Sequence, residues 1–177
     1  MSENLLKQAD QLKSEADELL LKVNLEKHFS DLGQVHVVSS YALDLMFRPD
    51  IDIFITSKSC DLDKAIIKTK ELLDTKLFQT IGFANHLDFP FPSNWRGCYW
   101  ELKVIKPNII WKFDVWYTAE SSIKAIQAIP IIQSKLQADP STRLKILTRK
   151  QTLFDGVKYR NNLNGFKICE EILGKIL

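Results

Sequence analysis

The chain has 177 residues, of which 45% are hydrophobic and 26% charged, and its formal net charge is +2. This apolar content suits one globular domain with a sizeable core, with or without a small helical appendage. The small net charge is by itself no argument for binding nucleic acid or a membrane. No apolar run is long enough to cross a bilayer, and the three cysteines show neither zinc-ligand spacing nor a disulfide framework. A cytoplasmic protein is therefore expected.

The spacing of apolar residues predicts most of the secondary structure. The elements expected in chain order are a helix over about residues 3–28, a strand over 34–38, a short helix over 39–46, a strand over 50–56, a helix over 62–73, strands over 78–87, 97–105 and 109–118, and helices over 119–136, 141–154 and 164–177. Pro130 is expected to stop or kink the first of the last three helices. Because the N-terminal helix is rich in charged residues, we do not expect it to be a signal peptide. This order of elements predicts an α+β sheet with helices at the C-terminal end, arranged as a core over residues 1–120 and a helical segment over 121–177.

Two aspartates in the second predicted strand carry the strongest functional signal. Asp50 and Asp52 lie two positions apart, so their side chains share one face. Ile51 and Ile53 then point toward the core. Adjacent carboxylates repel each other unless a cation neutralises them, and proteins hold Mg²⁺ with one or two carboxylates plus substrate phosphates. Phosphoryl or nucleotidyl transfer is therefore the first hypothesis, and the alternative is an exposed strand face after Pro49.

A second Asp-x-Asp motif, Asp61-Leu62-Asp63, provides an internal comparison. It stands at the predicted start of a helix, where an aspartate caps free amide groups and complements the helix dipole. We therefore interpret Asp61 and Asp63 as structural, unlike the pair in the strand.

Asp114 is an independent signal from another predicted strand. It lies in the aromatic run Trp111-Lys112-Phe113-Asp114-Val115-Trp116-Tyr117, where a carboxylate needs a partner or a function. Lys112 shares its face, so a plain salt bridge is the alternative explanation. Most aromatic residues of this region are expected in the core. Trp116 also shares the face of Asp114, and we take Lys112 and Trp116 as candidate substrate-binding residues, with Trp116 stacking on a ring.

Ser39 and Ser40 follow the first predicted strand. The start of a helix presents free N–H groups to an anion, and a serine adds a hydroxyl contact to phosphate. An ordinary serine cap is the alternative explanation for the pair.

Together these residues resemble the DNA polymerase β-like nucleotidyltransferase superfamily. The matching pattern is a strand, the pair Ser39-Ser40, nine residues, Asp50-Ile51-Asp52, a strand, and a distant Asp114 on another strand. The resemblance covers about residues 34–117, and the order of elements is also similar to small members that act on antibiotics or other small acceptors. It implies an α+β fold with a nucleotidyltransferase-like mixed β-sheet flanked by helices.

The resemblance also implies a function. The expected activity is Mg²⁺-dependent transfer of a nucleoside monophosphate from a nucleoside triphosphate, such as ATP, to a hydroxyl of a small-molecule acceptor. In the implied site, Asp50 and Asp52 bind two Mg²⁺ ions and the triphosphate. Asp114 helps to bind the metal nearest the acceptor and serves as general base. Ser39 and Ser40 are the implied nucleotide-binding residues.

The chain departs from the family at Ser39, where the family usually has a glycine that lets the backbone approach phosphate closely. Two other functions stay open: transfer to a protein or tRNA, and a non-catalytic nucleotide-binding or interaction module. The chain after residue 120 is short for a large RNA-binding domain, which favours a small acceptor. The C-terminal cations are expected on a solvated face, or in contact with nucleotide or RNA; they are Arg143, Lys145, Arg149, Lys150, Lys158 and Arg160.

Overall fold

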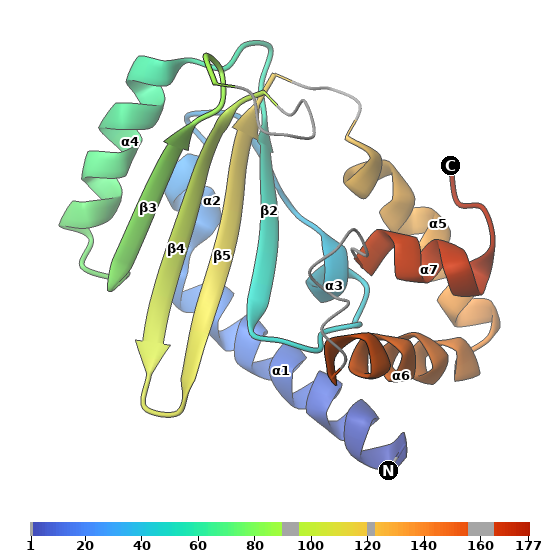
Figure 1. The fold of residues 1–177 in the computed structure, drawn as a ribbon. Coiled ribbons are helices and arrows are strands. Elements are labelled where there is room, and N and C mark those ends of the chain that lie inside the picture. Colours follow the sequence, from blue (N-terminus) through green and yellow to red (C-terminus); the bar gives the residue numbers. More distant parts are fainter. Residues whose placement is uncertain (1, 90–95, 120–122, 156–164) are drawn as a thin grey trace. The chain divides into compact units, whose positions relative to one another are not determined.

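The computed structural model describes residues 2–89, 96–119, 123–155 and 165–177 (Figure 1). Its elements are α1 (Ser2–Val23), α2 (Leu25–Phe29), β1 (Gln34–Val37), α3 (Ser39–Ala42), β2 (Asp50–Thr56), α4 (Leu62–Asp74), β3 (Thr80–Asn85), β4 (Cys98–Lys106), β5 (Ile109–Thr118), α5 (Lys124–Ala138), α6 (Ser141–Asp155) and α7 (Gly165–Leu173). The predicted α+β class is confirmed. Within these ranges no helix is both long and apolar enough to cross a bilayer.

The chain divides into two compact units. The sheet unit comprises Glu18–Val37 and Pro49–Ser121, and the helical unit comprises Met1–Asp17, Val38–Arg48 and Ser122–Leu177. Each unit thus combines segments that are distant in the sequence.

The sheet unit holds five strands in the order β1-β2-β5-β4-β3. β2 and β5 run parallel, and the other neighbours are antiparallel, so the sheet is mixed as predicted. Alternate residues of β4 and β5 build the core, because strand side chains alternate between faces. Trp100 lies at its centre, with its ring 5.6 Å from that of Phe29 in α2 and its indole N–H donating to Thr69 Oγ1 in α4 at 2.8 Å. Helices α2 and α4 therefore cover one face of the sheet, and the opposite face carries the polar residues.

The predicted N-terminal helix is two helices. Asn24 separates α1 from α2 with a left-handed backbone (φ 48°), and its side chain accepts a hydrogen bond from the N–H of Lys27 at 3.3 Å. Asparagine tolerates this conformation better than most residues. The backbone of Asn24 therefore ends the first helix, although the spacing of apolar residues predicted one helix to about residue 28.

Other boundaries also differ from expectation, such as the start of α5 at Lys124 and the end of α7 at Leu173. The short helix at Ser39 ends at Ala42 instead of residue 46, and Asp44 beyond it has a positive φ of 54°. Pro130 does not stop α5, which runs unbroken from Lys124 to Ala138. Residues 90–95, between the strands expected over 78–87 and 97–105, lie outside the described residues.

In the helical unit, α5, α6 and α7 share a core with Leu43 and Leu45, and with Ala9 of α1. The predicted solvated face of α6 is wrong at Lys150, whose side chain is buried. Its ammonium donates to Ser40 Oγ at 2.8 Å and to the carbonyl of Leu45 at 2.7 Å. Lys158 and Arg160 lie outside the described residues.

Candidate active site

The parallel pairing of β2 with β5 brings the predicted aspartates to one face of the sheet. Asp52 lies directly opposite Asp114, and Asp50 lies opposite Lys112. The intervening residues of both strands are fully buried on the other face, as for Ile51. Burial of these apolar residues sets the register, because a slip by one residue would turn every side chain to the wrong face.

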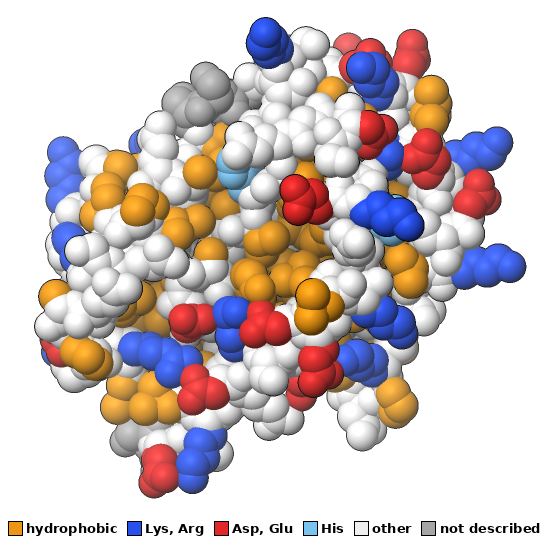
Figure 2. Space-filling view, turned by 180° about the vertical axis from the view of Figure 1, so that it is seen from behind, with side chains coloured by type: hydrophobic (Ala, Val, Ile, Leu, Met, Phe, Trp, Pro, Cys, Tyr) orange, Lys and Arg blue, Asp and Glu red, His pale blue; other side chains and the backbone are white. Residues whose placement is uncertain are grey.

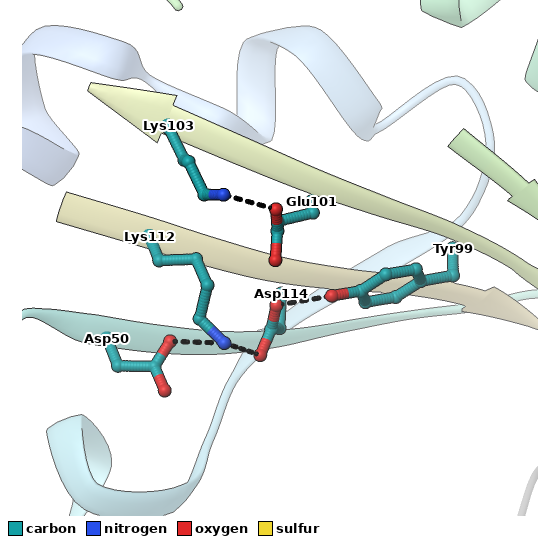
Figure 3. Close-up of polar contacts among 6 residues, drawn as sticks. All are labelled: Asp50, Tyr99, Glu101, Lys103, Lys112 and Asp114. Atoms are coloured by element: carbon teal, nitrogen blue, oxygen red, sulfur yellow. Dashed lines mark hydrogen bonds and ion pairs between the residues drawn. The ribbon is translucent and has the colours of Figure 1, made fainter. Parts of the chain in front are cut away.

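Lys112 stands between two of the carboxylates (Figure 3). Its ammonium donates to Asp114 Oδ2 at 2.6 Å and lies 3.3 Å from Asp50 Oδ1. The salt bridge that the sequence allowed is therefore present, and it extends to a second aspartate on the neighbouring strand. Lys112 is the internal counter-ion of this acidic face.

The surroundings of Asp50 make its carboxylate harder to ionise. Burial and the charges of Asp52 and Asp114 raise its pKa to about 6, although the Lys112 ammonium acts in the opposite direction. Burial alone would lower the pKa of Lys112, but its hydrogen bond to Asp114 and the two carboxylate charges outweigh burial and raise it. The acidic face thus keeps Lys112 charged and makes Asp50 easier to protonate than an ordinary aspartate.

Tyr99 of β4 was not among the predicted site residues. Its hydroxyl donates to Asp114 Oδ1 at 2.5 Å, so both oxygens of Asp114 accept hydrogen bonds (Figure 3). Burial and this hydrogen bond raise the pKa of Tyr99. The signal that could have found Tyr99 is the pairing of β4 with β5, which places it diagonally beside Asp114, opposite Trp116.

Glu101 and Lys103 extend the charged face along β4. Glu101 lies opposite Asp114 and Lys103 lies opposite Lys112. The two β4 side chains pair with each other at 2.6 Å (Figure 3). Glu101 therefore adds a fourth carboxylate to the face, balanced by its own lysine.

An aromatic group borders the carboxylates at the other end of the face. The Trp116 ring stacks on His86, with ring centroids 5.4 Å apart, and lies 5.0 Å from the Tyr99 ring. The sequence predicted the facing of Trp116, but not its contact with His86, which comes from the end of β3.

The three aspartates and Lys112 together determine how well this face fits Mg²⁺. No group of three or more His, Cys, Asp or Glu side chains within the described ranges stands ready to hold a metal ion, and Lys112 lies between Asp50 and Asp114. The donor set nevertheless suits a hard cation, which prefers oxygen ligands. Asp50 Oδ1 is buried and accepts no hydrogen bond from any described residue. A buried carboxylate oxygen with an ion-pair partner but no hydrogen bond, beside two further aspartates, fits a divalent cation.

Ser39 and Ser40 belong to the helical unit, and their contacts lie within that unit. Ser39 has a positive φ of 56°, the conformation that favours glycine. The Ser40 hydroxyl accepts from the buried ammonium of Lys150. Arg48, near the aspartates in sequence, stacks over the Phe154 ring at 3.3 Å.

Compared by sequence, the chain matches no protein-family model and no curated protein. Its fold is similar to several solved structures. The Cid1 poly(U) polymerase has a TM-score of 0.63 and 14% identity, over 96% of this chain and 54% of Cid1. GLD-2, in the GLD-2/RNP-8 complex, has a TM-score of 0.59 and 14% identity, over 96% of this chain and 62% of that chain. The conserved protein GrpB from Enterococcus faecalis has a TM-score of 0.51 and 16% identity, over 94% of this chain and 92% of GrpB.

These likenesses establish the class of fold, which is the nucleotidyltransferase-like α+β fold that the sequence predicts. The chain spans about half of Cid1 and less than two thirds of GLD-2. At this level of identity the likeness defines the fold alone.

Proposed function

We propose that this chain is a Mg²⁺-dependent nucleotidyltransferase that moves a nucleoside monophosphate from a nucleoside triphosphate to a hydroxyl of a small-molecule acceptor. One observation carries the proposal. Within a nucleotidyltransferase-like fold, Asp52 lies opposite Asp114 on parallel strands, with Asp50 on the same face. The Cid1 structure was determined with Mg and 3′-dATP bound, which supports the cofactor and the co-substrate.

Each carboxylate has a distinct role in the proposed reaction. Asp50 and Asp52 would hold the two Mg²⁺ ions and the triphosphate, and Asp114 would help to hold the ion nearest the acceptor. Mg²⁺ supplies Lewis-acid stabilisation of the attacking and leaving oxygens. The acceptor hydroxyl attacks the α-phosphorus in line, and pyrophosphate leaves. Most of the rate then comes from positioning and charge stabilisation.

The remaining residues position these groups. Tyr99 orients the Asp114 carboxylate through its hydroxyl, and Asp114 takes the proton of the acceptor hydroxyl. Lys112 neutralises the aspartates before the substrates bind and moves toward phosphate oxygens when they arrive, because an ammonium is a strong phosphate partner. Ser39 and Ser40 contact the triphosphate, and Trp116 stacks on a ring of the acceptor.

The charge distribution supports a small acceptor. The cations of α6 are paired within their own unit, Arg143 with Asp10 at 2.6 Å and Arg149 with Glu171 at 3.0 Å. On the face shown in Figure 2, the described Lys and Arg side chains are interspersed with Asp and Glu. A polyanion such as RNA binds chiefly through basic residues that neutralise its phosphates, and paired cations serve that purpose poorly.

RNA is the second candidate acceptor. The observation that favours it is the likeness of fold to Cid1, a poly(U) polymerase. A non-catalytic nucleotide-binding module is the third possibility, and the serine at position 39 is the feature that favours it.

The experiment incubates the full chain with each labelled nucleoside triphosphate and Mg²⁺. The acceptors are a panel of hydroxylated small molecules that includes antibiotics, then tRNA, then cell extract. We expect label on a small molecule, lost when a chelator replaces Mg²⁺. Label on tRNA would select the RNA alternative. No transfer to any acceptor, with no Mg²⁺-dependent nucleotide binding, would leave only the nucleotidyltransferase-like fold.

Variants of the two Asp-x-Asp motifs make the test specific. Asp52→Asn should abolish transfer, yet it should keep or raise stability by about 0–2 kcal/mol in metal-free buffer, because it relieves repulsion within the cluster. The matched control is Asp63→Asn at the exposed start of α4, which should retain activity. Equal activity of the two variants would contradict the assigned site.

A further inference from the structure

Two of the three cysteines lie side by side in the sheet unit. Cys60 stands in the segment between β2 and α4, and Cys98 is the first residue of β4. They are 38 positions apart in sequence, yet their sulfur atoms are 3.9 Å apart. Both are free thiols, as is the third, Cys169 of α7 in the helical unit. The spacing in the sequence gave no sign of this pairing.

Tyr117 of β5 holds the segment around Cys60. The Cys60 thiol donates to the carbonyl oxygen of Tyr117 at 3.3 Å. The Tyr117 hydroxyl donates to the carbonyl of Ser59 at 3.1 Å and accepts from the N–H of Asp61 at 3.3 Å. The residues on both sides of Cys60 are thus fastened to one buried side chain, so the position of the thiol does not depend on its own weak hydrogen bond.

Cys98 is fastened to the same residue from the other side. It lies opposite Tyr117 in the β4–β5 ladder. The preceding Gly97 allows the close approach of the strands, because a Cβ atom there would lie 2.3 Å from the Tyr117 carbonyl oxygen. Two thiols held against one rigid residue are a preorganised pair, and preorganisation raises the rate of a reaction between them.

The two thiols differ in access and acidity. Cys60 is partly exposed beside the exposed Lys58 and Ser59, whereas Cys98 is fully buried. The hydrogen bond with Cys98 lowers the pKa of Cys60, and the same contact together with burial raises the pKa of Cys98. Thiolate character and access govern which cysteine meets an oxidant. We therefore expect Cys60 to react first with an oxidant, and Cys98 to react second, with the oxidised Cys60.

We propose that Cys60 and Cys98 form an oxidative modification site in which a peroxide converts the pair to an intramolecular disulfide. The Cys60 thiolate attacks one oxygen of hydrogen peroxide and the O–O bond breaks. The leaving hydroxide takes up the proton that the Cys60 thiol released, so that water and a Cys60 sulfenic acid result. The Cys98 sulfur then displaces hydroxide from the Cys60 sulfur, its proton leaves with that hydroxide as a second water, and the S–S bond forms. In sum, two thiols and one hydrogen peroxide give one disulfide and two waters.

The geometry needs only a small movement. A disulfide bond is about 2.0 Å long, so the two sulfur atoms have to approach by about 1.9 Å from their 3.9 Å separation. The product ties the segment after β2 to the start of β4, on the two sides of β5. It closes a loop of 38 positions in the sheet unit and thereby restricts the unfolded chain. The proposal does not depend on nucleotidyl transfer.

The experiment treats the reduced full chain with hydrogen peroxide, denatures it, and counts the remaining thiols by alkylation and mass spectrometry. We expect the three thiols to fall to one, with the linked peptides containing Cys60 and Cys98. The same treatment in urea should form this link at least about tenfold more slowly, because the folded chain no longer positions the pair. Three remaining thiols, a link through Cys169, or an equal rate in urea would each overturn the proposal.

Four variants assign the roles. Cys169→Ser, the matched control, should form the link as the wild type does. Cys60→Ser should form no link, and Cys98→Ala should leave a Cys60 sulfenic acid that a dimedone probe traps. Tyr117→Phe keeps the buried ring and removes the hydroxyl with its contacts to Ser59 and Asp61, so it should slow formation of the disulfide severalfold. Circular dichroism of each variant excludes unfolding as the cause. A folded Cys60→Ser variant that still lost two thiols to a disulfide at the wild-type rate would refute the site.

Discussion

At the scale of single residues, the candidate site is a balance between carboxylates and one lysine. Asp50, Asp52 and Asp114 share a sheet face, and the Lys112 ammonium lies within 3.3 Å of the first and 2.6 Å of the last. Like charges brought this close destabilise a folded protein unless a cation compensates them. Lys112 provides part of this compensation in the absence of metal, and a bound divalent cation would provide more.

Replacing that lysine should expose the competition between ammonium and metal. Lys112→Ala should lower the free energy of unfolding by about 1–3 kcal/mol in chelator, because it leaves carboxylates without their partner. Added Mg²⁺ should then raise the midpoint of thermal unfolding more in Lys112→Ala than in the wild type. Lys103→Ala, which removes only the partner of Glu101, is the control. An equal response of both variants to Mg²⁺ would contradict metal binding beside Asp50.

The raised pKa of Asp50 predicts a pH dependence of stability in metal-free buffer. This pKa is about 6 in the folded chain and about 3.9 in an unfolded chain. Between these values the folded state keeps a proton that the unfolded state has lost, so the free energy of unfolding falls as pH rises from about 4 to about 6. Denaturant titrations across this range should show the decline in the wild type and a weaker one in Asp50→Asn. The exposed-site variant Asp63→Asn should behave as the wild type.

Ser39 is one of the non-glycine residues with a left-handed backbone. A φ of 56° costs a non-glycine residue about 1–2 kcal/mol in the folded state. A glycine at this position would avoid that cost, but it would also make the unfolded chain more flexible, which offsets part of the gain in stability. Ser39→Gly should therefore raise the free energy of unfolding by about 0.5–1 kcal/mol in urea titrations. The neighbouring Ser40→Ala should lower it by about 1–3 kcal/mol, since it removes an acceptor of the buried Lys150 ammonium. A loss of stability in Ser39→Gly would show that the serine side chain has a structural role.

At the scale of elements, strands β4 and β5 have one apolar face and one polar face. Trp100 and Phe113 are buried on the face covered by α2 and α4, and Tyr99 and Asp114 stand on the opposite face. The alternation of a strand produces both faces from one sequence. One face provides stability, and the other is free to carry charge.

Helix α5 allows a measurement of how much a proline in the interior of a helix lowers the free energy of unfolding. Pro130 is exposed in the interior of the helix, where it cannot donate a hydrogen bond to the carbonyl of Ile126. Pro130→Ala should raise the free energy of unfolding by about 1–3 kcal/mol. The exposed Gln127→Ala in the same helix is the control, with an expected change within about 0.5 kcal/mol. No gain in Pro130→Ala would mean that the proline stabilises its surroundings in another way.

At the scale of the whole molecule, each unit is built from segments that are distant in sequence. Ala9, Leu43 and Leu45 share the core of the helical unit with α5, α6 and α7. The N-terminal part of the chain therefore supplies apolar residues to a core that the C-terminal helices complete, and the expected core over residues 1–120 includes residues of both units.

A shortened chain tests this dependence. A chain ending at Ala119 should expose Leu43 and Leu45, at about 1.5–3 kcal/mol of lost burial for each leucine. We expect stronger binding of a hydrophobic dye and a broader thermal transition than in the full chain. If the shortened chain instead unfolds cooperatively at the midpoint of the full chain, residues 1–119 form an independent domain.

Local patterns in the sequence were enough for the fold class, most element boundaries and the facing of the aspartates. The alternation over residues 109–118 predicted β5 with its bounds, and Asp61 caps α4 as expected, accepting from the N–H of Lys64 at 3.1 Å. Side-chain periodicity and capping depend on residues a few positions apart, so they can be read without a structure. The roles of Asp50, Asp52 and Asp114 in catalysis stay a prediction.

Only the tertiary structure determined which residues of different strands, loops and helices contact each other. The register that sets Asp52 opposite Asp114, the Tyr99 hydroxyl on Asp114, the burial of Lys150 and the meeting of Cys60 with Cys98 all join residues from separate elements. Such contacts arise from the packing of whole faces and the pairing of strands, in which many weak apolar contacts choose one register among several. A single sequence carries no local mark of that choice, because each partner alone looks like an ordinary strand, loop or helix residue.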